Sequence, residues 1–275
     1  MKRNRSEGWR HAKLTGHENE DNITTLLKED SNLQHRILKC ARKEDAKIVD
    51  IIDGGLNETN VYSVFGDKTK NKTDLKIILS NDDSINISIK KSLAGQVYLI
   101  TAERFISGYE KIYKQEIPSI VKRAIQLFWG EANDTREIIQ KFKYQTESKI
   151  YEYQLRKNRL VANTLTLYDP KLPNELLKWF DNNMFNIIDF CFSRGLTIDE
   201  KEKAEIIWYK NTLKENDIDT ILWIPQIKND VYSKCFFGKT LGGTTIQLPF
   251  GFVQWHQGCI QFHHKYEKVN KLFNK

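Results

Sequence analysis

The chain has 275 residues, of which 29% are charged and 40% are hydrophobic. A chain of this length can bury a sizeable core, in one domain or in two closely packed ones. No apolar run approaches the roughly 20 residues that a membrane helix needs. The basic start MKRNRSEGWRHAK leads into no apolar segment, so we expect no secretory signal there. We therefore expect a soluble protein without a membrane partner.

Net charge and cysteine spacing indicate which ligands the protein could bind. The formal net charge is +7, which favours a polyanionic partner, although many proteins share such a value. The cysteines lie far apart and form no CxxC pair, so the sequence predicts neither a zinc site nor a disulfide framework, and we expect reduced thiols at Cys40, Cys191, Cys235 and Cys259.

Hydrophobic periodicity predicts the elements of the front half. Positions 18–43 have helical spacing, with Ile23 and Leu27 on one stripe. Short strands are expected around Lys47–Ile52 and Val61–Phe65, separated by a turn at 53–55. After a hairpin, residues 100–131 indicate two helices, the second starting near Pro118, a residue tolerated in the first turn of a helix.

The hairpin covers KTDLKIILSNDDSINISIKKS, residues 72–92. Leu75, Ile77 and Leu79 alternate with polar residues, as do Ile85, Ile87 and Ile89, with turn residues between the two runs. Because a slip of one residue would turn one set of apolar side chains away from the core, odd positions should pair with odd ones.

The pairing that we predict sets Leu75 against Ile89 and therefore Asp74 against Lys90, with Cβ atoms roughly 5 Å apart. Ser88 stands one pleat from Lys90 on the same face. A carboxylate, a hydroxyl and an ammonium would then converge on one rim. An ordinary hairpin with a solvated face and a cross-strand ion pair explains this stretch equally well when it is taken by itself.

The second half begins near Asn163, after a Lys- and Tyr-rich connector. A long apolar-striped helix is expected over 175–195, ending at Gly195, followed by strands at 205–211 and 220–227. The tail 235–266 is rich in glycine and aromatic residues, and its alternating runs predict sheet. We expect an α/β fold with a catalytic part at 1–160 and a β-rich recognition part at 161–275, closely packed or forming one domain.

Metal-dependent phosphodiester cleavage requires oxygen ligands for Mg²⁺ and a cation near the attacking water. Asp74 and Lys90 supply two of these parts. A further acid can come from the first helix, where Glu20 lies on the stripe of Ile23 and Leu27; Glu18, on a solvated edge, ranks second. The alternative for Glu20 is an acid that favours a helix N-terminus.

The order of helix acid, strand aspartate and strand lysine (TD…SIKK) resembles the split active site of the PD-(D/E)xK nucleases. GHENEDNITTLL, the segment QVYLITAERFISGYEKIYKQEIPSIVKRAIQLFWGE, the helix LLKWFDNNMFNIIDFCFSRGL and the terminal IQFHHK are similar to parts of the small type II restriction endonucleases that cut four-base-pair sites. The resemblance covers about two thirds of the chain loosely. It implies a restriction-endonuclease-like fold, with a mixed central β-sheet flanked by helices.

Carried over to this sequence, the resemblance makes Asp74 and Glu20 metal ligands and Lys90 the catalytic lysine, with Mg²⁺ as cofactor. Ser88 is a departure, because it stands where the pattern usually has Asp or Glu. The site would then hold one ion, or use Glu20 and the backbone carbonyl of Ile89 as further ligands. Lys91 is the alternative candidate for the catalytic lysine. The alternation of the strand, however, turns Lys91 toward the core face.

Polar residues in the tail and beside the hairpin are candidates for DNA contacts. Duplex binding requires neutralisation of phosphates, and sequence reading requires donors and acceptors at base edges. A solvated sheet face with glycine turns is the alternative for each of them. His263 and His264 cannot both face one way in a regular strand. The candidates are Lys91, Gln96, Lys239, Thr244, Thr245, Gln247, Gln254, His256, Gln257, Gln261, His263, His264 and Lys265, with Lys2, Arg3, Arg5 and Arg10 as a basic arm.

The favoured hypothesis is a type II restriction endonuclease that hydrolyses both strands of a short duplex site with Mg²⁺. The resemblance further implies a bacterial cytoplasmic protein, a cognate DNA methyltransferase as partner, and activity as a monomer. A mismatch or repair nuclease on the same fold is one alternative. A non-catalytic DNA-binding module with a decayed site is the other.

Overall fold

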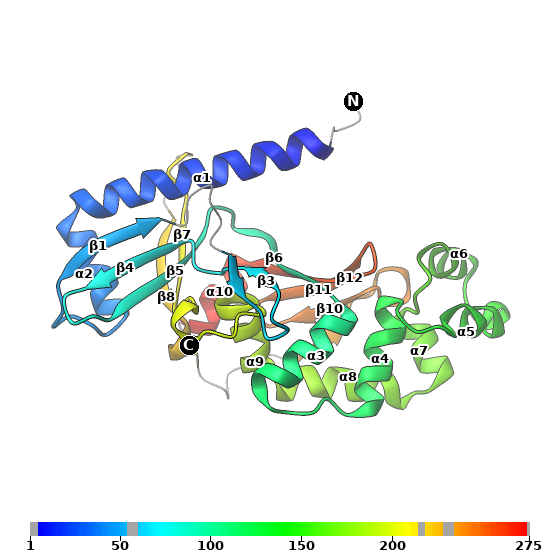
Figure 1. The fold of residues 1–275 in the computed structure, drawn as a ribbon. Helices are drawn as coiled ribbons and strands as arrows, with labels where there is room; N and C mark the ends of the chain where they lie inside the picture. The colour runs from blue at the N-terminus through cyan, green and yellow to red at the C-terminus, as the bar shows by residue number, and fades with distance from the viewer. Residues whose placement is uncertain (1–4, 54–59, 214–217, 228–233, 274–275) are drawn as a thin grey trace. The chain divides into compact units, whose positions relative to one another are not determined.

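The computed structural model describes residues 5–53, 60–213, 218–227 and 234–273 (Figure 1). The chain forms two compact units, one of Met1–Leu93 with Phe192–Ile227 and the other of Ala94–Cys191 with Lys228–Lys275. These units do not follow the expected boundary at 160/161. The reason is that each sheet recruits strands from both halves of the chain, which no single cut separates.

The first unit is built on a mixed sheet in the order β1-β4-β5-β7-β8, in which only β5 and β7 run parallel. A separate ribbon pairs β2 with β3. The elements are α1 (Arg5–Glu29), α2 (Ser31–Cys40), β1 (Ile48–Asp53), β2 (Asn60–Tyr62), β3 (Lys68–Lys70), β4 (Leu75–Leu79), β5 (Ser84–Lys90), β7 (Ile206–Lys210) and β8 (Asp219–Trp223).

The helical stretch expected at 18–43 is two helices. Asp30 separates them, because its side chain accepts hydrogen bonds from the backbone N–H groups of Asn32 and Leu33 and so caps α2. The first helix also begins earlier than expected, at Arg5. Glu20 is therefore in the middle of α1, and an N-terminal role for this acid is excluded.

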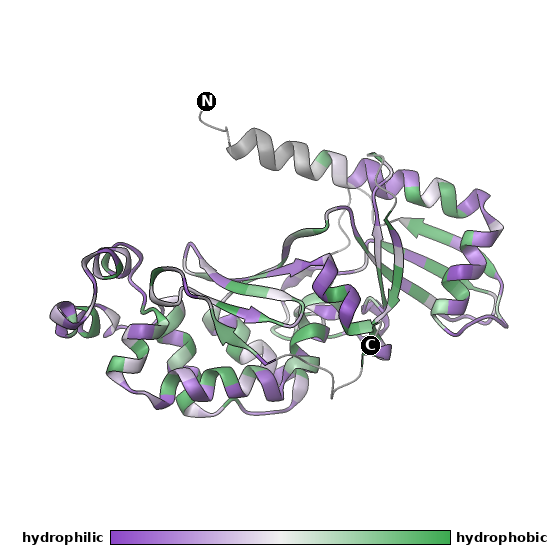
Figure 2. Cartoon of the chain, turned by 180° about the vertical axis from the view of Figure 1, so that it is seen from behind, coloured by the Kyte–Doolittle hydropathy of each residue, from purple (hydrophilic) through white to green (hydrophobic). Residues whose placement is uncertain are grey.

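Helices α1 and α2 cover one face of the sheet. Ile23 and Leu27 of α1 are fully buried in one cluster with the odd-numbered residues of β4 and β5. In Figure 2 the apolar residues of the strands in this unit are green. The even-numbered residues of the hairpin, from Asp74 to Lys90, consequently share the opposite face.

The hairpin register differs from the prediction. Leu75 pairs with Ile87, and Ile77 with Ile85, so the strands are displaced by two residues from the pairing of Leu75 with Ile89. The cause is the turn: Leu79 N–H donates to Asp83, and Asp82 adopts a left-handed conformation with φ 62°. The parity, and with it the division into faces, is as predicted.

The second unit is built on an antiparallel sheet in the order β6-β12-β11-β10-β9. Helices α3, α4 and α8 lie along one side of it (Figure 1). The elements are β6 (Ala94–Thr101), α3 (Ala102–Tyr113), α4 (Ser119–Trp129), α5 (Thr135–Lys141), α6 (Ser148–Lys157), α7 (Ala162–Tyr168), α8 (Lys171–Asn182), α9 (Met184–Ile188), β9 (Phe236–Phe237), β10 (Thr245–Leu248), β11 (Gly251–His256), β12 (Cys259–Lys265) and α10 (Tyr266–Phe273).

Two helical regions of this unit differ from expectation. The connector before Asn163 contains α5 and α6, and the stretch 175–195 is interrupted at Asn183, whose side chain accepts a hydrogen bond from the Tyr109 hydroxyl (2.8 Å). A π-helical turn, Asp189–Arg194, completes that stretch before Gly195. The α/β class, the mixed five-stranded sheet with flanking helices and the β-rich C-terminal part are confirmed.

Candidate active site and nucleic-acid interface

Asp74 stands immediately before β4 and is held by the neighbouring strand. Its N–H donates to the Ile87 carbonyl (2.9 Å), and its Oδ2 accepts from the Ile89 N–H (2.7 Å) and from Ser88 Oγ (3.2 Å). The observed register thus places Asp74 opposite Ser88 rather than Lys90. The contacts of the carboxylate within the described residues all go to Oδ2, which leaves Oδ1 for a ligand.

Lys90 reaches back over the same face of β5. Its Nζ donates to Ser88 Oγ (2.6 Å) and to the Ile89 carbonyl (3.2 Å), and lies 3.9 Å from Asp74 Oδ2. Ser88 is only 1% exposed and accepts from the lysine while donating to the aspartate. Carboxylate, hydroxyl and ammonium therefore converge, as predicted, although through a different register.

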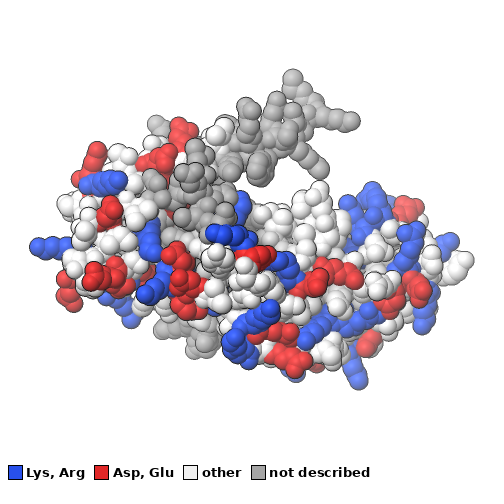
Figure 3. Space-filling model, viewed as in Figure 1, with Lys and Arg blue, Asp and Glu red and all other residues white. Residues whose placement is uncertain are grey.

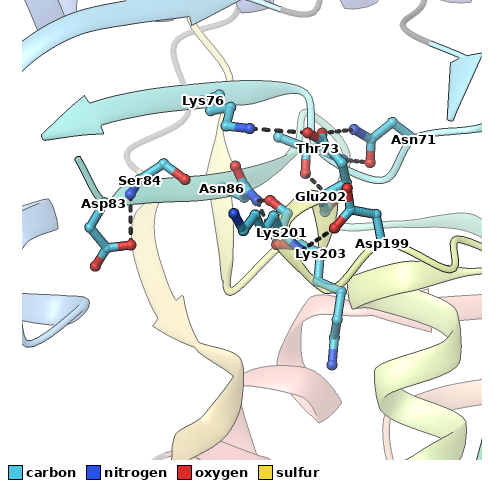
Figure 4. A network of polar contacts seen from close by, with 10 residues as sticks. All are labelled: Asn71, Thr73, Lys76, Asp83, Ser84, Asn86, Asp199, Lys201, Glu202 and Lys203. Carbon is cyan, nitrogen blue, oxygen red and sulfur yellow. Dashed lines mark hydrogen bonds and ion pairs between the residues drawn. The ribbon is translucent and has the colours of Figure 1, made fainter.

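A polar network beside this group fixes the start of β4 (Figure 4). Thr73 Oγ1 donates to the Glu202 carbonyl (3.0 Å), and the Glu202 carboxylate accepts from Asn71 (3.0 Å) and from Lys76 (3.1 Å). On the partner strand, Asn86 donates to two backbone carbonyls of the same segment. Because Thr73 directly precedes Asp74, this network restricts where the catalytic candidate can lie.

Glu20 lies on the α1 stripe whose Ile23 and Leu27 pack against the other face of the sheet. Its carboxylate lies 3.3 Å from His17 Nδ1, one turn earlier in the helix. The structure does not bring Glu20 into the contacts around Asp74, so its role as a metal ligand stays a prediction. Glu18 is exposed, in agreement with its lower rank.

Asn19, which the sequence interpretation did not single out, ties α1 to the end of β7. It is 1% exposed, donates to the Lys210 carbonyl (3.1 Å) and accepts from the N–H (2.7 Å) and hydroxyl (3.0 Å) of Thr212. Tyr209, which precedes Lys210, pairs with Lys90 across β5 and β7. Asn19 therefore anchors the helix near the strand ends that carry the site.

We expect Asn19→Ala to lower the free energy of unfolding by about 1–3 kcal/mol, because it leaves buried backbone groups of the 210–212 segment without partners. Urea unfolding measures this loss. Asn22→Ala is the matched control: its side chain is exposed and makes one contact, with Thr212, so the change should be within about 0.5 kcal/mol. Equal effects of the two substitutions would contradict the anchoring role.

Mg²⁺ is the ion that the oxygen donors around Asp74 would suit. Within the described residues, no group of three or more His, Cys, Asp or Glu side chains could hold a metal ion. Mg²⁺, however, keeps several waters and commonly binds through one or two carboxylates plus substrate phosphates. Asp74 Oδ1 and the Ile89 carbonyl are hard oxygen donors of this kind, although Lys90 occupies the carbonyl in this arrangement. The residues fit such an ion.

Most of the predicted DNA-contacting residues share one face of the second sheet. Its other face is apolar and includes Ile246, Val253, Ile260 and Phe262, all fully buried. Register and alternation place the following together on the outward face: Gln96, Thr245, Gln247, Gln254, His256, Gln261, His263 and Lys265. We call this set the polar face.

The two adjacent histidines separate as predicted. His264 is 3% exposed and lies on the buried side of the sheet, whereas His263 lies on the polar face, stacked on Phe252 with ring centroids 4.5 Å apart. Burial, and secondarily the charge of His256, lowers the pKa of His263 below its usual range. His263 is therefore neutral near pH 7.

The remaining candidates lie elsewhere. Lys91 donates to Thr15 of α1, on the side to which its parity assigns it. Gln257 occupies the turn between β11 and β12 with φ 51°. Lys239 borders a hollow of about 510 Å³, and the Thr244 carbonyl accepts from the buried Arg159. Lys2 and Arg3 lie outside the described residues, as do the side chains of Arg5 and Arg10.

A basic and an aromatic side chain meet on the other side of this sheet, because alternation along β11 places Trp255 with Val253 rather than with Gln254. Lys157, at the end of α6, lies over the Trp255 ring at 4.7 Å. Figure 3 shows Lys and Arg side chains gathered over α6. The sequence interpretation treated the stretch that holds Lys157 as a connector, and in the tail it did not single out Trp255.

Comparisons with known proteins give a structural likeness but no family. No protein-family model matches the sequence, and no curated protein matches it. A crystal structure of the restriction endonuclease MspI in complex with its cognate DNA is similar at 13% identity and a TM-score of 0.41, over 84% of this chain and 77% of that chain. A likeness of this extent indicates neither the activity nor the ligand of this chain. Among the described helices, none combines the length and apolar composition that crossing a bilayer requires.

Proposed function

We propose that this chain is a sequence-specific endonuclease of the PD-(D/E)xK class that cuts both strands of duplex DNA at a short site, as type II restriction enzymes do. The observation that carries the proposal is the convergence of Asp74, Ser88 and Lys90 on one face of the β4-β5 hairpin. The polar face of the second unit supports a partner that presents hydrogen-bonding edges.

The roles follow from the contacts. Asp74, oriented by the Ile89 N–H, would hold Mg²⁺ through its remaining oxygen, with Glu20 and the Ile89 carbonyl as further proposed ligands. The ion would supply charge neutralisation at the scissile phosphate and activation of water. Lys90 orients the attacking water and stabilises the developing negative charge. Ser88 bridges the two charged groups, because it accepts a hydrogen bond from Lys90 and donates one to Asp74.

The test is incubation of unmethylated phage DNA with the purified protein and Mg²⁺. We expect discrete fragments with Mg²⁺ and intact DNA when EDTA removes the metal, because without the ion the Asp74 carboxylate repels the phosphate and Lys90 alone supplies positive charge. Sequencing of the fragment ends gives the site and the stagger. Fragmentation that persists in EDTA would overturn the metal-dependent mechanism.

A second candidate is a DNA-binding module without catalysis. Ser88 favours it, since a neutral side chain there binds metal poorly, and so does the hydrogen bond from Lys90 to the Ile89 carbonyl. This candidate predicts tight, salt-sensitive binding and no strand scission at any Mg²⁺ concentration. A repair or mismatch nuclease, in contrast, would cut mismatched duplexes and spare intact ones in a parallel digest.

The restriction hypothesis brings further proposals. A cognate methyltransferase would protect host DNA, and both proteins would act in the bacterial cytoplasm. We propose that the nuclease acts as a monomer, which sedimentation of the DNA complex tests.

A further inference from the structure

Three glutamines on the polar face form a hydrogen-bonded chain across three strands. Gln254 Nε2 of β11 donates to Gln261 Oε1 of β12 (2.8 Å), and Gln261 Nε2 donates to Gln96 Oε1 of β6 (2.6 Å). Gln261, the central member, is 7% exposed. We call these residues the amide chain. It spans two strand spacings, about 10 Å, close to the roughly 12 Å width of the major groove of B-DNA.

A bulge puts the third glutamine on this face. Phe262 pairs with Tyr98, but the next residue, His263, pairs with Gln96, so Val97 is the extra residue in β6. Without the bulge, Gln96 would share the buried side with Tyr98, whose ring contacts Phe190. Bulges commonly re-aim a side chain in this way. Here the re-aimed side chain is the end of the amide chain.

The amide chain has a fixed direction. Reversing one amide would oppose two amino groups or two carbonyls, so the three can reverse only together. In the observed direction, Gln254 Nε2 lies 3.3 Å from His263 Nε2, which accepts from it when the neutral ring has its proton on Nδ1. Stacking on Phe252 holds the ring in place. Within the described residues, Gln254 Oε1 and Gln96 Nε2 then remain without protein partners.

The surroundings suit a polyanion. The five strands of this sheet contain no aspartate or glutamate, while β12 ends in Lys265. The strand β6 is an edge strand, so the sheet margin that carries Gln96 can enter a groove. In the major groove, cytosine and adenine present an exocyclic amino donor, whereas guanine and thymine present a keto acceptor.

We propose that the amide chain distinguishes amino from keto bases at two positions of the DNA site. Gln254 accepts from the amino group of cytosine or adenine, and Gln96 donates to the keto oxygen of guanine or thymine. Gln261 makes no base contact and is a positioning residue that fixes both terminal amides. The proposal rests on the proposed function, because it takes duplex DNA as the ligand.

The experiment is selection of bound duplexes from a random pool by the full chain in EDTA, which prevents metal-dependent cutting. The affinities of duplexes with single base-pair exchanges are then measured. We expect two positions in the wild-type site where exchanging an amino for a keto base lowers affinity by about 5- to 150-fold, the range for one lost base contact. In Gln261→Met, both preferences should fall below about fivefold, because the freed amides can turn to suit either base.

Two further variants complete the test. Gln96→Met changes an exposed side chain and should remove one of the two preferences, which keeps the proposal testable if Gln261→Met does not fold. Gln126→Met, on the exposed side of α4, is the control and should retain both. If the wild type is selective and its preferences survive in Gln96→Met and in folded Gln261→Met, the amide-chain proposal is wrong. The endonuclease proposal is then unaffected. A wild type that binds no duplex overturns the proposed function instead.

Discussion

Asp74→Asn should lower the rate of DNA cleavage at least about 100-fold while leaving the fold intact. The asparagine carbonyl can still accept from the Ile89 N–H, so the contact that orders the hairpin remains. What is lost is the negative charge for a metal ion, and losing even an outer-shell partner of a metal typically reduces activity about 10- to 100-fold. Single-turnover cleavage with Mg²⁺ measures the effect.

The control for this substitution is Asp82→Asn in the turn of the same hairpin. Asparagine tolerates the left-handed conformation that Asp82 adopts, so neither the turn nor the cleavage rate should change. DNA affinity in EDTA should be equal to or above that of the wild type in Asp74→Asn, since a negative charge near the phosphate has been removed. Cleavage by Asp74→Asn within about tenfold of the wild-type rate would exclude Asp74 as the metal-binding carboxylate.

The hairpin illustrates how much of the site the sequence predicts. Alternation assigned Asp74, Ser88 and Lys90 to one face correctly, because side-chain parity in a strand follows from the pleat. The register was wrong because it depends on the turn, and the Asn-Asp-Asp stretch permits loops of several lengths. The left-handed residue, Asp82, sets the observed one. The three groups still converge in the observed register, because Ser88 and Lys90 are two residues apart on one face and the lysine side chain is long enough to reach back to Ser88.

The polar face was predictable for the same reason, and Gln96 was among the predicted DNA contacts, but its place on this face was not predictable. Alternation in β11 and β12 brought Gln254, Gln261 and His263 together without knowledge of the fold. Gln96 joins them only through the bulge at Val97, which depends on how β6 pairs with β12. Long-range pairing of this kind leaves no local signal in a single sequence. The anchoring of α1 by Asn19 depends likewise on a segment almost two hundred positions away.

Removing the ammonium of Lys90 should have an effect as large as that of Asp74→Asn. In Lys90→Met the aliphatic stem keeps its packing, and the donor that we propose to act at the phosphate is lost. Loss of one preorganised donor to developing negative charge typically lowers the rate by about 10²- to 10³-fold. The free energy of unfolding should fall by about 1.5–3 kcal/mol, the usual range for a hydrogen bond of a charged group, because Lys90 donates to Ser88 and to the Ile89 carbonyl. The hairpin should still fold, since Ser88 continues to donate to Asp74.

Lys39→Met on the exposed side of α2 removes the same charge away from the site and should leave the cleavage rate unchanged. Comparing the two variants separates a role in the reaction from a general attraction of the DNA phosphates. If the two lysines only attract phosphates, both variants should bind DNA more weakly, and the loss of affinity should depend on salt. If Lys90→Met lost cleavage and binding in equal proportion, Lys90 would act in DNA binding. If it lost cleavage with affinity and folding retained, the ammonium acts on the attacking water or the transition state, as its contacts with Ser88 and Asp74 suggest.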